Sequence, residues 1–175
     1  LPTLGISHGV MSFIGDIGYH RFNEPLWNRS GLQFDLQYPL LPRFSVSAFL
    51  LSGRIGSNDY VPERPLNFRA SIVSEGVLLR YEWISNKMNQ QILIPYITGG
   101  IGYTFFMSKA DLKDGQGRTY HYWSDGSIRD LAEDAPNAAD AVRIYRDYDY
   151  ETDLRDANLD GFGKYRPGTL TIPAG

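Results

Sequence analysis

Residues 31–38 read Gly-Leu-Gln-Phe-Asp-Leu-Gln-Tyr, and apolar and polar side chains alternate along the whole stretch. Leu32, Phe34, Leu36 and Tyr38 share one parity, while glutamine and aspartate fill the other. Successive side chains of a β-strand point to opposite faces of a sheet, so this period of two predicts a strand with one apolar and one polar face. A membrane strand between lipid and a polar lumen has this pattern.

Five further stretches show a similar alternation and predict further strands. They are residues 9–22, 44–53, 73–83, 95–106 and 163–175. In the third of these, Val77 and Leu79 share one face, whereas Arg80 and Glu82 share the other. If the apolar parity faces outward, we expect the polar residues Asp16, Asp35, Arg80 and Glu82 to line the interior of a barrel and to close its lumen.

The connections between these stretches alternate in length. Residues 39–43 and 85–91 are short, residues 23–30 and 54–67 are longer, and residues 108–160 form by far the longest connection. Outer-membrane barrels have short periplasmic turns and long external loops, so this order predicts that residues 108–160 are an external insertion. Aromatic girdles are expected at both rims. We expect Tyr38, Phe44, Trp83 and Tyr96 at the inner rim and Tyr19, Phe22, Phe105 and Phe106 at the outer rim.

Composition narrows the class of protein. Aromatic residues make up 14% of the chain, which also contains 18 Gly and 10 Pro, and this favours an all-β protein rich in turns. The net charge of -3 offers no basic surface for phosphates, so we expect no nucleic-acid partner. No run of about 18 apolar residues is present, which excludes a transmembrane helix in this sequence. We also expect that any signal peptide has been removed.

Three segments resemble the barrel strands of OmpA/OmpX-type outer-membrane proteins, particularly those of Bacteroidota. They are residues 9–19 (GVMSFIGDIGY), 95–106 (PYITGGIGYTFF) and 161–175 (GFGKYRPGTLTIPAG). The resemblance implies a transmembrane, antiparallel up-and-down β-barrel of about eight strands in the bacterial outer membrane, with lipid as its surroundings. Only about six strands are visible here, so we expect one barrel domain over residues 1–175 that is incomplete at its C-terminus.

The resemblance implies a non-enzymatic protein of the cell envelope, with a structural or surface-interaction role. Some related small barrels belong to the type 9 secretion and gliding apparatus, so envelope or secretion proteins are expected partners. Two alternatives stay open: a soluble β-barrel that carries an apolar ligand, and an outer-membrane enzyme that modifies lipids. The carrier would turn its apolar parity inward and its polar parity outward.

One short motif is related to calcium loops. Asp156, Asn158 and Asp160 recur at alternate positions before a glycine, which is how an EF-hand loop begins. The twelfth position is Pro167 instead of glutamate, so an EF-hand is rejected and a looser Ca²⁺ loop competes with a solvated turn. No other cofactor is expected. Upstream, four carboxylates alternate with other residues: Asp147, Asp149, Glu151 and Asp153. Because their negative charges repel one another, they favour binding of a cation or pairing with arginines.

Candidate catalytic groups are sparse. The only histidines are His8, His20 and His121, and no serine lies in a nucleophile-elbow pattern. His20 shares its parity with Asp16 and Ser12, which permits a triad at the rim, but lumen-lining polar residues explain the same pattern. We therefore predict no catalytic site.

Aromatic residues in the longest connection predict a partner-binding loop. Tyr120, Tyr122 and Trp123 precede an Asp-Gly turn, a composition that can contact glycans or a protein. The same loop could instead cover the mouth of the barrel.

Overall fold

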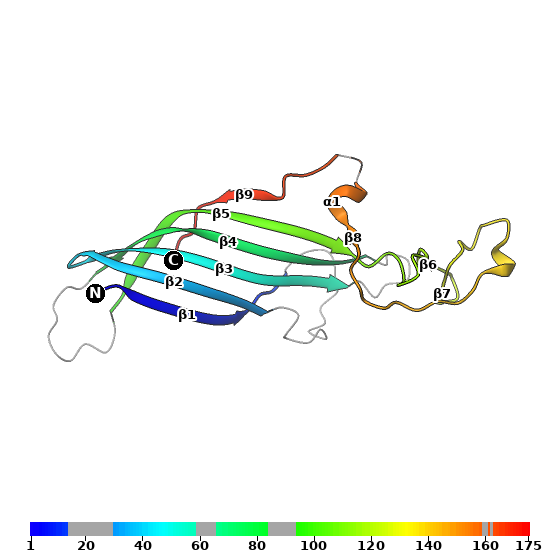
Figure 1. Cartoon of the computed structure of the whole chain (residues 1–175), viewed down its shortest axis with the longest axis horizontal. Helices are drawn as coiled ribbons and strands as arrows, with labels where there is room; N and C mark the ends of the chain where they lie inside the picture. The colour runs from blue at the N-terminus through cyan, green and yellow to red at the C-terminus, as the bar shows by residue number, and fades with distance from the viewer. Residues whose placement is uncertain (14–29, 59–65, 84–93, 159–160, 162) are drawn as a thin grey trace.

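The computed structural model describes residues 1–13, 30–58, 66–83, 94–158, 161 and 163–175. Most of them form one antiparallel sheet (Figure 1). Its long strands are β1 (Thr3–Val10), β2 (Ser30–Leu41), β3 (Phe44–Asn58), β4 (Asn67–Glu82) and β5 (Tyr96–Ala110). Two short strands, β8 (Thr152–Asp153) and β9 (Gly168–Thr171), pair with β5. The prediction of an all-β chain is confirmed.

Each long strand pairs with its neighbour in the sequence, in the order β1-β2-β3-β4-β5. Backbone hydrogen bonds extend the β5·β9 pairing in both directions, from Phe106 N to Pro167 O and from Thr98 N to Gly175 O. Within the described residues, β1 and β9 lie at opposite edges of the sheet and are not paired with each other, so the sheet is open. The up-and-down order is confirmed, whereas a closed barrel is not seen.

The strands predicted from residues 31–38, 44–53, 73–83 and 95–106 correspond to β2, β3, β4 and β5, and three of these four are markedly longer than the alternation indicated. The first strand was misplaced. It runs from Thr3 to Val10, while residues 11–13 lie outside it and residues 14–22 are not among the described positions. In the last predicted stretch, the regular strand is limited to Gly168–Thr171.

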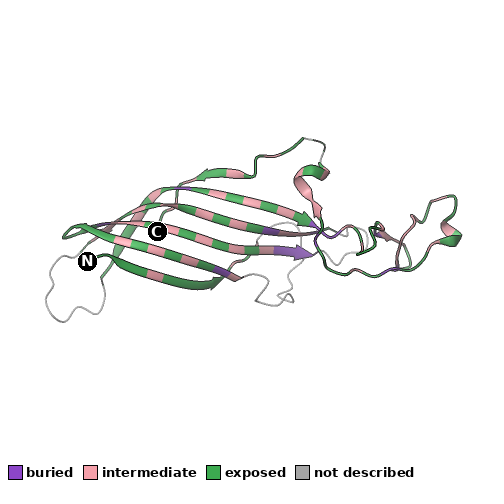
Figure 2. Ribbon diagram, viewed as in Figure 1, coloured by how far each residue is buried: buried purple, intermediate pink, exposed green. Residues whose placement is uncertain are grey.

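Exposure alternates along β2, β4 and β5, as the bands of colour in Figure 2 show. Leu36, Val77 and Ile101 are exposed, whereas Asp35, Leu78 and Thr104 are half-buried. In a curved sheet, side chains on the concave face lie closer together than those on the convex face and are more buried. We therefore call the half-buried side the inner face. The predicted sorting of apolar and polar parities onto two faces is confirmed, although Phe49, Leu78 and Phe106 add apolar side chains to the inner face.

Glycines allow inner-face side chains to lie close to the backbone. A Cβ at Gly76 would lie 2.8 Å from the Phe49 ring, and one at Gly102 would lie 3.4 Å from the same ring. Phe49 thus covers two adjacent strands, β4 and β5. Small barrels fill their interiors with side chains in this way and leave no open pore.

Two adjacent glycines of β5 provide a matched test of this packing. A Cβ at Gly100 would collide with the Val77 carbonyl oxygen and lie 2.9 Å from Leu78 Cα, whereas a Cβ at Gly99 meets nothing within 4 Å. We expect Gly100→Ala to destabilise the fold by about 1–3 kcal/mol, as overpacking does. Gly99→Ala is expected to stay within about 0.5 kcal/mol of the parent. Urea unfolding of the purified protein measures both, and equal shifts for the two variants would contradict the inner-face packing.

Candidate functional site

The exposed face of the sheet is apolar over most of its area. We call it the apolar face. Its exposed large residues on the four central strands and β9 include Leu32, Phe34, Leu36, Tyr38, Phe44, Leu50, Val73, Val77, Leu79, Ile97, Ile101, Tyr103, Phe105, Met107 and Leu170. On β1, Leu4 and Ile6 extend the same face because they lie opposite Leu36 and Phe34. The face is therefore continuous from one edge of the sheet to the other.

The height of the apolar face can be followed along β4 and just beyond it. From Val73 to Trp83 every second residue lies on this face, and the ten steps span about 33 Å along the chain. At a barrel-like tilt of about 40° this projects to about 25 Å, the height of the apolar band on outer-membrane barrels. Beyond Val73 polar residues enter the face: Ser71 pairs with Arg54 on one side and with the exposed Met107 on the other, and one row further Arg69 pairs with Lys109.

Three polar residues interrupt the apolar face. Glu75 lies near the middle of β4, opposite Leu50 and Tyr103, and no described residue forms an ion pair or hydrogen bond with it. Residues that pair across neighbouring strands form rows that run across the sheet. His8 and Ser52 lie in the row that also contains Leu32 and Val73, one row nearer the end of β5 than the row of Glu75. Every other large side chain in these rows is apolar or aromatic.

Aromatic side chains gather at the end of the sheet that carries the short β2–β3 turn. Phe44 contacts Tyr81 with a centroid separation of 4.9 Å, and Tyr81 contacts Trp83 at 6.4 Å. Tyr38 and Tyr96 are exposed near the same end, but Tyr96 has the inner-face parity of β5 and its ring lies against Arg80. Of the predicted inner-rim set, only Tyr38, Phe44 and Trp83 therefore lie on the apolar face. Toward the opposite end of the sheet, Phe105 is exposed on the apolar face, where it pairs with Val73.

Phe106 does not belong to the outer girdle. It has the inner-face parity of β5 and stacks on Tyr165 at 5.6 Å, so that part of the prediction is wrong. Adjacent residues of a strand cannot share a face, which the girdle assignment overlooked. Tyr19 and Phe22 lie outside the described residues.

Three of the four predicted lumen charges, Asp35, Arg80 and Glu82, lie on the inner face but do not form one cluster. Arg80 Nη2 pairs with Glu82 Oε1 at 3.4 Å, and the Arg80 guanidinium lies 3.8 Å from the centroid of the Tyr96 ring. Asp35 accepts a hydrogen bond of 2.8 Å from Gln33 Nε2, in the middle of β2. Asp16 is not among the described residues. An inner face with these polar groups is confirmed, and their closing of a lumen stays a prediction.

Beyond the end of β5, residues 111–157 form a folded extension that we call the protrusion (Figure 1). Its outer part contains the hairpin of β6 (His121–Tyr122) and β7 (Ile128–Arg129) and the 3₁₀ turn η2 (Ala138–Asp140). Its last part returns to the sheet, where β8 pairs with the end of β5 and the short helix α1 (Leu154–Ala157) follows. The predicted insertion of residues 108–160 is thus largely this protrusion, but residues 108–110 still belong to β5.

A buried polar network attaches the protrusion to the sheet. Asp111, which directly follows β5, is 0% exposed and its Oδ2 accepts hydrogen bonds of 2.9 Å from Arg146 Nε and Nη2. Asn67, at the start of β4, exchanges two hydrogen bonds with the Asp111 backbone. Asn58, at the end of β3, accepts from Arg146 and from the Tyr150 hydroxyl.

Burial raises the free energy of the ionised Asp111 carboxylate. It raises the pKa of Asp111 above its usual value, although the hydrogen bond and charge of Arg146 lower it. Among the described residues, no group forms a hydrogen bond with Asp111 Oδ1. The guanidinium therefore offsets part of the cost of one buried negative charge at this junction, and its removal would leave that charge uncompensated.

Of the three aromatic residues predicted to bind a partner, Tyr120 is buried, whereas Tyr122 and Trp123 are half-buried. Tyr120 is 7% exposed and its hydroxyl hydrogen-bonds to Asp147, while burial raises the pKa of the Tyr122 hydroxyl. Trp123 Nε1 donates to Leu131 O at 2.9 Å, and Arg129 covers its ring at 3.8 Å. The expectation of an exposed loop is wrong for Tyr120, which is buried, as are Ile144 and Tyr150 of the same protrusion.

The predicted calcium ligands have other partners. Asp156 Oδ1 pairs with Lys164 Nζ at 2.7 Å, and Asn158 Oδ1 accepts a hydrogen bond from Gly163 N at 2.6 Å. Asp160 lies outside the described residues. In the part of the chain that the structure describes, no three His, Cys, Asp or Glu side chains gather as a metal site would need. Calcium binding stays an untested prediction.

The alternating carboxylates do not share the face of a strand. Asp147 accepts from the Tyr120 hydroxyl, Glu151 accepts from Leu112 N, and Asp153 caps α1 by accepting from Arg155 N. Arg146 pairs with Asp111 instead of with these groups. The network around Asp111 was missed because its members are far apart in sequence.

The candidate triad is only partly described. Ser12 is exposed, while Asp16 and His20 are outside the described residues. His8 lies on the apolar face and His121 lies in β6. Among the described helices, none has the length and hydropathy to cross a membrane.

Comparison with protein-family models, with curated proteins and with solved structures found no match. The class that the structure itself defines is an open antiparallel β-sheet protein with one apolar, exposed face and a folded protrusion at one end.

Proposed function

We propose that this chain forms the wall of a bacterial outer-membrane β-barrel, with its apolar face against lipid and its protrusion outside the cell. Its role is non-enzymatic: the sheet anchors the protrusion, which presents a surface to other envelope or secretion proteins. The observation that carries the proposal is the exposure of the apolar parity, while the polar parity lies on the half-buried inner face.

The exposed apolar side chains of the sheet support lipid as the surroundings. Apolar patches on soluble monomers seldom exceed a few hundred Å², because water disfavours larger ones. Among the described residues the buried hydrophobic set is only Ala70, Ala110, Tyr120, Ile144 and Tyr150, so the sheet gains little stability from a core of its own.

The carrier interpretation has less support. It needs apolar side chains on the inner face, around a ligand, and polar side chains on the outside. Leu36, Val77 and Ile101 have the opposite orientation. A sheet with that arrangement would bind apolar molecules on its outer surface, where a bilayer offers them.

Electrophoresis of the full-length protein, extracted from cell envelopes, tests the proposal. Folded outer-membrane barrels resist detergent until they are boiled, so we expect detergent-dependent extraction and a band that shifts on boiling. Protein that is released without detergent and migrates identically in both samples would contradict membrane insertion. Residues 111–157 should stay protected from protease in the unboiled sample, since their network is buried.

A further inference from the structure

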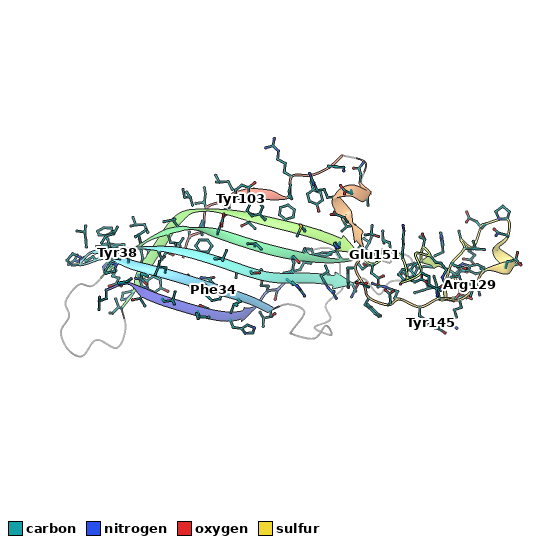
Figure 3. All side chains as sticks on the ribbon, in the orientation of Figure 1. Phe34, Tyr38, Tyr103, Arg129, Tyr145 and Glu151 are labelled. Atoms are coloured by element: carbon teal, nitrogen blue, oxygen red, sulfur yellow. The ribbon has the colours of Figure 1, made fainter. Side chains whose placement is uncertain are left out.

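The segment that returns from the tip of the protrusion carries a strip of exposed apolar and aromatic side chains. Val142, Tyr145 and Tyr148 are 54%, 71% and 53% exposed. Arg143 lies 5.5 Å from the Tyr145 ring centroid, and Arg146 lies 4.8 Å from that of Tyr148. Tyrosine and arginine dominate the centres of protein interfaces, because they combine a large contact area with polar groups. Tyr145 lies along the outer edge of the protrusion (Figure 3).

The backbone beneath this strip is held in place before any partner arrives. Ile144 is 4% exposed, and its N–H donates to Ile128 O at 2.9 Å. Arg146 is tied to Asp111, and Asp147 N donates to the Tyr120 hydroxyl at 3.2 Å. Binding to a pre-organised surface loses less conformational entropy than binding to a flexible loop.

The net negative charge of the protrusion favours a partner with a basic surface. Residues 111–157 contain twelve Asp and Glu against six Lys and Arg, a net charge of -6, while the remaining residues carry eight acidic and eleven basic side chains, a net charge of +3. Asp147 and Asp149 are exposed and flank Tyr148 in the sequence. Such a surface repels phosphate-bearing lipids and nucleic acids, whereas it attracts and orients a basic surface.

We propose that Val142, Tyr145 and Tyr148 form the centre of a docking surface for a protein that presents a Lys- and Arg-rich face. The inference deepens the proposed function, and it rests on that proposal only for the side of the membrane on which the partner lies. In this proposal Tyr120 is not a contact residue, because it supports the strip from within through its hydrogen bond with Asp147 N.

Photo-crosslinking in the native host cells tests this surface. The probe is p-benzoylphenylalanine, placed in the full-length protein at position 145 and, as a control, at the buried position 120. We expect an adduct with a protein at position 145 only, and its cross-linked peptide should be rich in Lys and Arg. Glycan or lipopolysaccharide adducts alone, an acidic peptide, or no adduct above the control would overturn the proposal.

Two matched alanine variants make the test specific. Tyr148→Ala should reduce the yield of the adduct by about tenfold or more, the effect of truncating a central interface residue. Tyr38→Ala should leave the yield unchanged, since Tyr38 is similarly exposed but lies at the opposite end of the sheet. Equal yields from both variants would contradict the docking surface.

The same samples, run unboiled and boiled, separate this inference from the membrane proposal. A heat shift without an adduct contradicts the docking surface alone, because the sheet has then folded as proposed. An adduct from protein that shows no heat shift contradicts membrane insertion and leaves the docking surface standing.

Discussion

Val77→Arg is expected to prevent the sheet from folding into a bilayer, whereas Ser71→Arg on the same strand and face is expected to be tolerated. Val77 lies near the middle of the apolar face, while Ser71 lies beyond its polar boundary, beside Arg54. A cationic side chain costs about 2–4 kcal/mol at the centre of a bilayer and about 0–1 kcal/mol near its interface, because only the interface keeps the charge hydrated.

Folding of the urea-unfolded protein into phosphatidylcholine vesicles, measured by the heat-shifted band, provides the comparison. Both variants add the same side chain to the same strand, so a general defect in β4 would affect them equally. Similar folding yields for Val77→Arg and Ser71→Arg would contradict the placement of the apolar face in lipid.

Arg146→Ala is expected to destabilise the protrusion by about 3–5 kcal/mol, the usual cost of leaving a buried charge without its partner. Asp111 is fully buried, and Arg146 supplies its two side-chain hydrogen bonds. Cleavage by protease within residues 111–157 should become fast while the sheet keeps its heat shift. Arg118→Ala is the control, since Arg118 pairs with Asp114 at the more exposed side of the protrusion and its loss should change the rate little.

A second substitution identifies the cause of the loss. Asp111→Asn removes the negative charge that Arg146→Ala leaves uncompensated, so the double variant should recover part of the stability lost by the single one. If Arg146→Ala resists protease as the parent does, or if Asp111→Asn adds to its effect in full, the network is not what attaches the protrusion.

The sheet could be predicted from sequence because period-two alternation is a local signal. In β2, β4 and β5 the residues that alternate in sequence also alternate in exposure, so both the strands and their faces followed from pattern alone. The full length of the strands could not be predicted from this pattern. Ser57 and Asn58, for example, extend β3 because they pair with β4 and not because of hydrophobicity.

The first strand shows the limit of the same signal. Alternation continues past Val10, but the apolar residues change parity there, and Met11 turns inward over Gly31 and Gly53. Pairing with β2 determines where β1 lies, from Thr3 opposite Gln37 to Val10 opposite Ser30. A pairing of two strands is a long-range contact that periodicity within one strand does not contain.

The junction of sheet and protrusion had no sequence signal at all. Asp111 contacts Asn67 and Arg146, and Tyr150 contacts Asn58, across 44, 35 and 92 positions of the chain. The residues involved are polar and aromatic, so the segment has the composition of a solvated loop. Its aromatic residues were therefore predicted to be surface contacts, although folding buries Tyr120 and exposes Tyr145.

The apolar face can be tested one residue at a time, because the chain contains no cysteine. Single cysteines at positions 72–79 of β4, labelled with an environment-sensitive fluorophore in vesicles, report whether each side chain meets lipid. The account predicts alternation, with positions 73, 77 and 79 quenched by lipid-bound quenchers and positions 72, 74 and 78 protected from them. Uniform quenching, or alternation with the opposite phase, would contradict it.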